Sequence, residues 1–208
     1  MREAVIVEAV RTPIGKRNGA LSGIRAEDLA ASPLAEVLKR ANVPASIVED
    51  VIMGCVTQVG EQAFDIGRQA ALIAGYPEEV PGVTIDRQCG SSQQAVHFAA
   101  QAIISGDMDV VVAAGVESMS RVPMFSNTLG IELSEKLTSK YDIINQGLSA
   151  DLVADKYGIG KKEMDEFSLQ SHHKAIAARE KGYFQKEIMP IEVEQEDGTK
   201  VRVSEDEG

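Results

Sequence analysis

Short apolar runs rich in β-branched residues alternate with longer, alanine-rich amphipathic stretches in the first half of the chain. The apolar runs predict four strands, over residues 4–10, 51–56, 83–85 and 110–114. The fourth is almost purely apolar, as expected of a strand covered on both faces. Because this alternation is typical of βαβ units around a parallel sheet, the pattern predicts an α/β fold.

Three helices are predicted between these strands, over residues 26–41, 65–74 and 91–105. Gly75 and Gly106 follow the second and third helices, at positions that fit left-handed C-caps. Pro33 lies inside the first helix, so the chain either starts a new helix there, capped by Ser32, or kinks.

The pattern changes after Val116, where Ser, Asn and Gly become frequent and no period is sustained. We place a domain boundary near Ser120, which divides the chain into residues 1–120 and 121–208. Two further helices are predicted in the second part, over residues 148–157 and 163–181, followed by a hairpin of residues 188–194 and 199–203 that turns at Asp197-Gly198.

Net charge is −11 over 208 residues, and much of it lies in the last 22 residues. Nucleic-acid binding is excluded, because neutralising phosphates requires clustered Lys and Arg. The longest strongly apolar run is about seven residues, far below the ~20 that cross a bilayer. Glu3 and Glu8 interrupt the first apolar run, which argues against a secretory signal. We therefore expect a soluble protein with reduced thiols.

Cys89 is the sharpest candidate for chemistry. It lies between the third predicted strand and the third predicted helix, where a turn can hold a side chain at the helix N-terminus. The unpaired N–H groups and the positive end of the helix dipole favour a thiolate there, and they suit a developing oxyanion. Gly90 allows a ligand to approach the backbone closely. The local pattern leaves two readings open, a nucleophile and a buried structural cysteine.

The other candidate side chains point to less. Cys55 follows an apolar strand, which favours core packing. His97 lies about two turns along the helix from Cys89, too far to be its immediate base. His172 and His173 are consecutive, so on a helix they diverge by about 100° and cannot chelate one metal. No phosphate loop, dinucleotide fingerprint or zinc spacing is present, so no metal is expected.

Four segments carry a specific family resemblance. They are residues 8–15 (EAVRTPIG), 67–72 (GRQAAL), 87–92 (RQCGSS) and 114–120 (AGVESMS). Together they resemble the N-terminal half of the thiolases, the acetyl-CoA acetyltransferases and 3-ketoacyl-CoA thiolases. The resemblance implies a layered α/β thiolase domain with a mixed sheet, followed by the start of an inserted loop domain. It also implies that Cys89 takes the acyl group and that its backbone N–H helps to hold the acyl oxygen.

The implied reaction is acyl transfer between acyl-CoA and CoA through a cysteine thioester. Thiolytic cleavage of a 3-ketoacyl-CoA and condensation of two acetyl-CoA both stay open, as does the acyl length. The resemblance further implies that CoA and acyl-CoA are the substrates, that no cofactor is needed, and that the enzyme is a cytoplasmic homodimer of fatty acid metabolism.

This sequence departs from the family pattern in two respects. Asp86 stands where thiolases usually have a small neutral residue such as Asn, and a carboxylate that faced the sulfur would disfavour the thiolate. The Asn-x-His, Gly-His-Pro and Cys-x-Gly motifs, which supply oxyanion donors and acid/base groups, do not occur in the 208 residues. We therefore expect an incomplete enzyme that is inactive alone and has an unpaired sheet edge.

Two alternatives remain beside the thiolase interpretation. A ketoacyl synthase also places a cysteine at this helix, although residues 11–15 and 117–120 favour a thiolase. In the second alternative, the chain is a non-catalytic remnant, or one chain of a split enzyme, that binds a partner or CoA. Glu117 and Ser118 follow the fourth strand, where α/β sheets place ligands, and we expect them to be scaffold.

Overall fold

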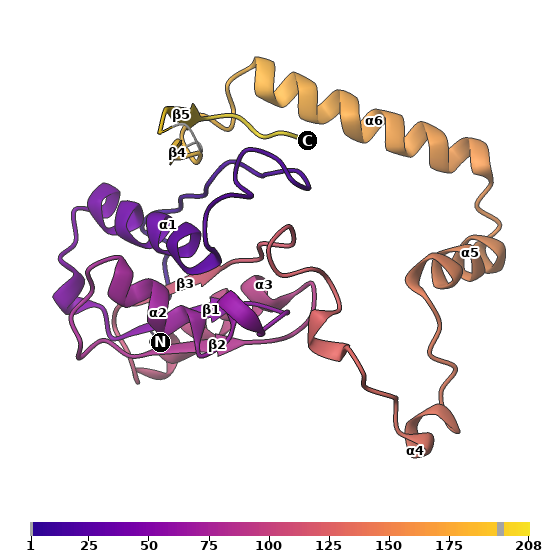
Figure 1. Ribbon diagram of the computed structural model, residues 1–208, viewed down its shortest axis with the longest axis horizontal. Helices are drawn as coiled ribbons and strands as arrows, with labels where there is room; N and C mark the ends of the chain where they lie inside the picture. The colour runs from indigo at the N-terminus through magenta and orange to yellow at the C-terminus, as the bar shows by residue number, and fades with distance from the viewer. Residues whose placement is uncertain (1, 195–197) are drawn as a thin grey trace. The chain divides into compact units, whose positions relative to one another are not determined.

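The computed structural model describes residues 2–194 and 198–208, which divide into two compact units (Figure 1). Residues up to Leu129 and from Lys186 onwards form the first unit, and Gly130–Gln185 form the second. The boundary near Ser120, which rests on the change in sequence composition, stays a prediction.

A three-stranded parallel sheet is the centre of the first unit. Its strands are β1 (Asp50–Gly54), β2 (Gly82–Ile85) and β3 (Val111–Gly115), in the order β2-β1-β3. The register places Met53 of β1 between Thr84 of β2 and Ala114 of β3. These strands confirm the predicted α/β class and three of the four predicted strands.

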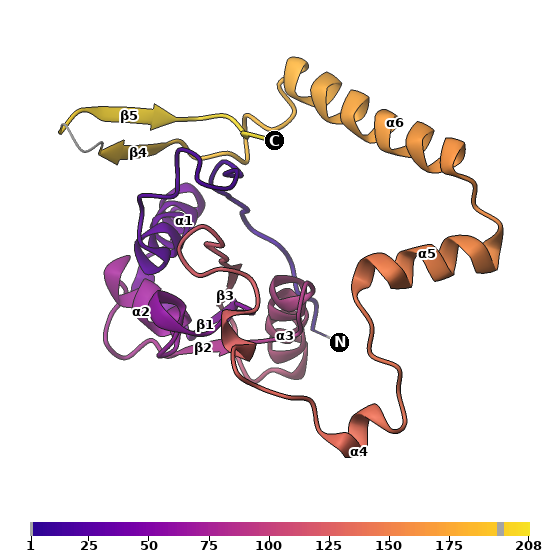
Figure 2. The same cartoon turned by 45° about the vertical axis from the view of Figure 1, so that its right-hand side comes forward.

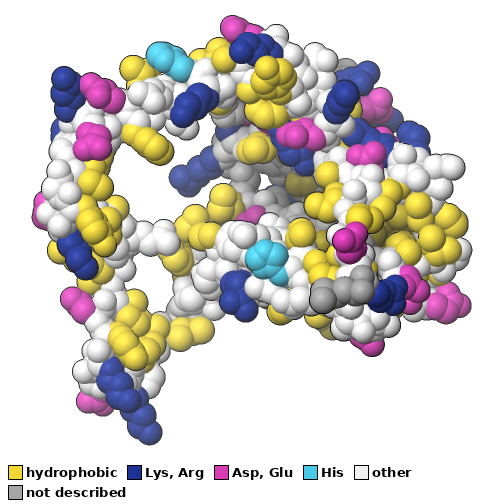
Figure 3. Space-filling model, turned by 180° about the vertical axis from the view of Figure 1, so that it is seen from behind, with side chains coloured by type: hydrophobic (Ala, Val, Ile, Leu, Met, Phe, Trp, Pro, Cys, Tyr) yellow, Lys and Arg dark blue, Asp and Glu magenta, His cyan; other side chains and the backbone are white. Residues whose placement is uncertain are grey.

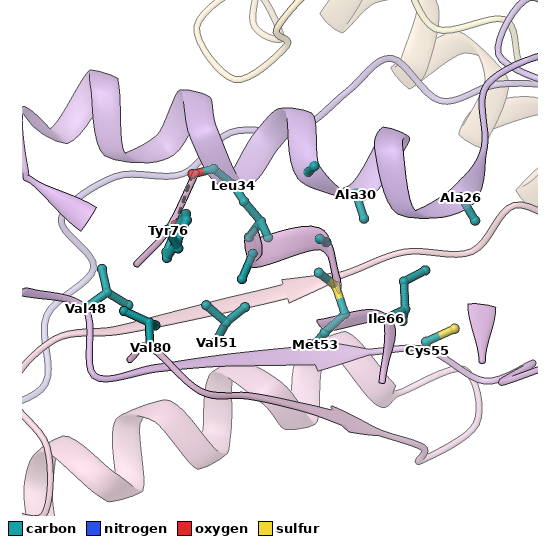
Figure 4. Packing of buried hydrophobic residues seen from close by; sticks show 13 residues of the cluster. Ala26, Ala30, Leu34, Val48, Val51, Met53, Cys55, Ile66, Tyr76 and Val80 are labelled. Carbon is teal, nitrogen blue, oxygen red and sulfur yellow. Dashed lines mark hydrogen bonds between the residues drawn. The ribbon is translucent and has the colours of Figure 1, made fainter. Parts of the chain in front are cut away.

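Helices cover both faces of this sheet (Figure 2). They are α1 (Ala26–Ala41), α2 (Ile66–Ile73) and α3 (Ser91–Ser105). Val51 and Met53 of β1 pack in one cluster with α1 and α2, where Figure 4 shows them beneath Leu34. Ile52, between them, packs with Ala95 and Ala99 of α3. Alternate side chains of the central strand thus build two apolar cores, as the period of a strand requires.

The first helix continues through Pro33 as a single element, so no new helix starts there. The side chain of Leu34 is buried, and the Tyr76 hydroxyl donates a hydrogen bond of 3.0 Å to the Leu34 carbonyl (Figure 4). Gly75 and Gly106 both have positive φ, and Gly106 is the left-handed C-cap of α3. These two glycines confirm the predicted helix ends.

The predicted strand over residues 4–10 is wrong for this chain, since the segment pairs with no strand in the part of the chain that the structure describes. Val5, Ile6 and Val7 are 71%, 81% and 73% exposed. An apolar sequence is not enough for a strand, because ladder hydrogen bonds need a neighbouring backbone edge. Among the described residues β3 pairs with β1 alone, and a cavity of about 730 Å³ lies between its other edge and the N-terminal segment.

The C-terminal hairpin is part of the first unit. Strands β4 (Ile191–Glu194) and β5 (Lys200–Val203) are antiparallel, which confirms the predicted hairpin, and Leu21 packs against both. The predicted turn includes Asp197, which lies outside the described residues.

The acidic end of the chain has a structural role. Asp206 binds the Arg11 guanidinium with two bonds of 2.7 and 2.9 Å, which lowers the pKa of its carboxyl. Glu207 accepts hydrogen bonds from the backbone N–H groups of Lys16 and Ala20. The last residues therefore hold the loop that follows the N-terminal segment.

The second unit contains α4 (Glu135–Thr138), α5 (Gln146–Tyr157) and α6 (Lys161–Glu180), and the last two confirm the helices predicted over residues 148–157 and 163–181. Hydrophobic side chains lie open along it, Phe167 among them at 74% exposed (Figure 3). No helix of the described chain is long and apolar enough to cross a membrane. Short 3-10 helices at Ala45–Ile47, Gly60–Gln62 and Ser126–Thr128 complete the described helices.

Leu34→Ala should lower the free energy of unfolding by about 2–5 kcal/mol, because it empties a fully buried site between α1 and the sheet. Leu72→Ala on α2 is the matched control, since Leu72 is 43% exposed and its loss leaves a smaller cavity. Urea unfolding followed by circular dichroism measures both. Equal losses for the two variants would contradict this account of the core.

Candidate active site

Cys89 lies in a tight turn that joins β2 to α3, and its side chain is exposed. Gln88 adopts a positive φ of 48°, and Gly90 is the N-cap residue of α3. The Ser91 hydroxyl accepts a hydrogen bond of 2.9 Å from the Arg87 N–H and donates one of 2.6 Å to the Gln88 carbonyl. The turn thus holds the cysteine at the N-terminus of a 15-residue helix, as the sequence predicts.

Two glycines let this helix rest directly on the sheet. A Cβ on Gly54, the last residue of β1, would lie 2.3 Å from the backbone N of Ser92. A Cβ on Gly115, the last residue of β3, would lie 2.5 Å from the Ser92 Cβ. Both distances are too short for any side chain, so glycine is required at both strand ends. Two strands that each end in glycine are the sequence signal for this contact.

Cys55 has the opposite environment. It is buried in the core cluster, and its N–H donates a hydrogen bond of 3.0 Å to the Ile85 carbonyl. Burial raises the pKa of the Cys55 thiol to about 12, and the nearby Glu117 carboxylate adds to this rise. Cys55 is therefore a protonated packing residue, which confirms the prediction from its apolar context.

Asp86, the residue that departs from the family pattern, forms hydrogen bonds within the turn. Its carboxylate accepts a hydrogen bond of 2.7 Å from the Gln88 N–H and one of 3.4 Å from the Gln88 side chain. Asp side chains commonly bond the backbone two residues ahead in this way. The carboxylate thereby supports the positive φ of Gln88 immediately before Cys89.

The three histidines lie apart from this turn in the chain. His97 is exposed on α3, eight residues and thus about 12 Å along the helix from Cys89. His172 and His173 are exposed on α6 in the second unit. Within the described residues no three His, Cys, Asp or Glu side chains gather as they would to hold a metal ion.

A buried polar network lies where β1 and β3 end. Glu117 accepts hydrogen bonds from the N–H groups of Val56 at 2.9 Å and Thr57 at 3.3 Å. Gln62 is completely buried, and its side-chain N–H₂ group donates to Glu117 at 2.7 Å. The side-chain oxygen of Gln62 accepts a hydrogen bond of 2.7 Å from the Ser118 N–H. These contacts fit the scaffold role expected of Glu117 and Ser118. Sequence reasoning missed Gln62, because a glutamine in a polar loop carries no local signal of burial.

Helices on both faces of a parallel sheet, with an exposed cysteine at a strand-to-helix turn, define an α/β protein suited to cysteine nucleophile chemistry. The family model for the N-terminal domain of thiolases matches residues 4–208. The chain therefore belongs to the thiolase family, as its four sequence segments predict.

Several curated thiolases are similar to this chain. A steroid 3-ketoacyl-CoA thiolase of Mycobacterium tuberculosis is 46% identical over 205 residues, which cover 93% of this chain and 50% of that protein. A 3-ketoacyl-CoA thiolase of Idiomarina loihiensis is 44% identical over 100% of this chain and 54% of its own. A beta-ketoadipyl-CoA thiolase of Acinetobacter baylyi is 40% identical, with 100% and 56% covered. The chain spans about half the length of these relatives.

Gly54→Ala should push the first turn of α3 off the sheet and slow alkylation of Cys89 by iodoacetamide, because its new methyl group meets backbone. Such overpacking typically costs about 1–3 kcal/mol of stability. Gly23→Ala is the control, since a Cβ there meets nothing within 4 Å. Mass spectrometry of the labelled thiols follows the rate, and a Gly54→Ala rate equal to that of Gly23→Ala would refute the proposed contact.

Cys89 should be labelled before Cys55 in brief alkylation at neutral pH, because only Cys89 is exposed. Burial raises the pKa of the Cys55 thiol to about 12, from the ordinary value of 9.0. The protonated Cys55 thiol therefore contributes fully to the free energy of unfolding below about pH 9, and this contribution is lost as the pH rises towards 12. Peptide mapping that found Cys55 labelled first in the folded protein would overturn this order.

Proposed function

We propose that this chain supplies the acyl-accepting half of a thiolase site, which transfers an acyl group between acyl-CoA and CoA through Cys89. The observation that carries the proposal is the exposed Cys89 thiol at the N-terminus of α3, while the second cysteine is buried. An exposed thiol at such a turn can reach the carbonyl carbon of a bound acyl group and form a thioester with it.

In the cleavage direction, the Cys89 thiolate attacks the 3-keto carbonyl carbon of a 3-ketoacyl-CoA. The bond between C2 and C3 breaks, and acetyl-CoA leaves as an enolate that takes up a proton. The thiolate of CoA then attacks the Cys89 thioester, releases the shortened acyl-CoA and returns the cysteine. We propose that the Cys89 backbone N–H holds the oxyanion in both steps, since the next two N–H groups along the chain already donate to carbonyls of the turn. Condensation of two acetyl-CoA is the reverse sequence.

Substrate class follows from the relatives, which are named as thiolases of 3-ketoacyl-CoA, steroid 3-ketoacyl-CoA and beta-ketoadipyl-CoA. CoA and acyl-CoA are accordingly the proposed substrates, with no cofactor. We extend the proposal to a cytoplasmic homodimer with a first domain of residues 1–120 and a loop domain of residues 121–208.

A second candidate role is that of one chain of a split enzyme that binds a partner. The second edge of β3, which no strand of the described residues covers, favours it, because such an edge beside an apolar cavity can accept an added strand. In both roles the proton donor for the departing enolate comes from outside the 208 residues. His97 lies two turns along α3 from Cys89, which makes it a poor substitute.

The 208-residue chain alone should not cleave acetoacetyl-CoA at an enzymatic rate. Loss of a positioned acid/base group typically costs about 10² to 10⁴ in rate, and loss of one oxyanion donor about 10² to 10³. Addition of the second half of a relative, such as the Mycobacterium tuberculosis protein, should restore thiolysis that Cys89→Ala abolishes. Thiolysis by the chain alone at a normal rate, absent in Cys89→Ala, would show that its acid/base groups lie within these residues.

A further inference from the structure

We propose that Glu117 and Gln62 are positioning residues for Cys89, because they brace the strand ends on which the first turn of α3 rests. The inference rests on the proposed function in one respect, that Cys89 is the nucleophile. Neither residue is proposed to touch a substrate.

Glu117 and Gln62, together called the brace, join the strand ends by hydrogen bonds. Glu117 follows Gly115 by two residues. Its carboxylate binds the N–H groups of Val56 and Thr57, which follow Gly54 by two and three residues. Because Gly54 and Gly115 are partners in the register of β1 and β3, the Glu117 side chain links the segments that follow both strands. These are the two glycines that contact Ser92 of α3.

Gln62 locks this arrangement from within. Its side-chain N–H₂ group donates to Glu117 at 2.7 Å and to the Thr57 carbonyl at 2.9 Å, and its oxygen accepts from the Ser118 N–H at 2.7 Å. The residue is fully buried, so no water can replace a lost partner without entering the core. The loop after β1 and the turn after β3 are thereby held by one amide.

The brace also reaches β2, from which the chain turns to Cys89. The Cys55 N–H, which immediately precedes Val56, donates to the carbonyl of Ile85, the last residue of β2. Asp86 and the nucleophile turn follow directly. A shift of the Glu117 contacts therefore moves the ends of all three strands beneath the turn.

Charge and position predict opposite effects of removing this carboxylate. A carboxylate that acted on Cys89 only through its charge would oppose the thiolate, so its removal would speed alkylation. A carboxylate that positions the turn favours the reactive geometry, so its removal slows alkylation. The direction of the change therefore identifies the role.

The test measures iodoacetamide alkylation of Cys89 in the full 208-residue chain across pH, for the wild type, Glu117→Gln and Glu117→Asp. Glu117→Asp keeps the negative charge but has a shorter side chain. It provides the test if Glu117→Gln does not fold. Protection of Cys55 from labelling shows in each sample that the core is folded.

Glu61→Gln is the matched control, because it makes the same chemical change one residue before Gln62. Glu61 binds Arg121 and the Ala26 N–H, and these contacts are not with the strand ends. The Arg121 ion pair holds the pKa of Glu61 at about 2, so this control also removes a charge at neutral pH.

We expect both Glu117 variants to slow Cys89 alkylation about tenfold at neutral pH and to alter its pH profile, with Glu61→Gln within about twofold of wild type. A folded Glu117 variant with a wild-type or faster rate would overturn the proposal. Equal slowing by Glu61→Gln would also overturn it, since the effect would then be general. Wild-type Cys89 that reacts no faster than a free thiol would instead refute the proposed function.

Discussion

Direct contact between the first turn of α3 and two glycine-terminated strands is the constraint on which the rest of the structure depends. Gly54 and Gly115 lie side by side in the parallel register, so the space that two side chains would fill is occupied by Ser92. The same register sends Val51 and Met53 to one core and Ile52 to the other. A slip of one residue would exchange these faces and place a side chain beneath the helix. The same strand register is therefore required both for the two cores and for the position of α3, at whose N-terminus Cys89 lies.

The two cysteines show how this fold separates reactivity from packing. Cys55 continues β1 into the core, where burial and the Glu117 carboxylate raise the pKa of its thiol to about 12. Cys89 stands on the turn above the sheet, exposed at a helix N-terminus. The same chemical group is an inert core residue in one place and a candidate nucleophile in the other. Burial makes the difference, since it raises the pKa of the Cys55 thiol and leaves only the Cys89 side chain accessible.

Polar side chains around the sheet hold loops in place, which the amino-acid composition alone does not indicate. The acidic C-terminal residues look like a solvated tail, yet Asp206 and Glu207 bind Arg11 and backbone N–H groups of the loop near the N-terminus. Glu117 and the buried Gln62 similarly join the strand ends. A carboxylate that accepts several backbone N–H groups replaces the ladder hydrogen bonds that a loop lacks. Such groups hold the irregular segments from which the candidate site is built.

The sequence by itself determined the α/β class, the limits of α1 and α3, and Cys89 as the residue at a strand-to-helix turn, because periodicity and glycine caps are local properties. It did not determine the state of residues 4–10, whose apolar pattern suits a strand but whose pairing depends on a distant backbone edge. Only the tertiary structure decided that Glu117 lies near the buried Cys55 and that Gln62 bonds Glu117 and Ser118. Burial and long-range hydrogen bonds join residues far apart in the chain, and no local pattern encodes such a contact.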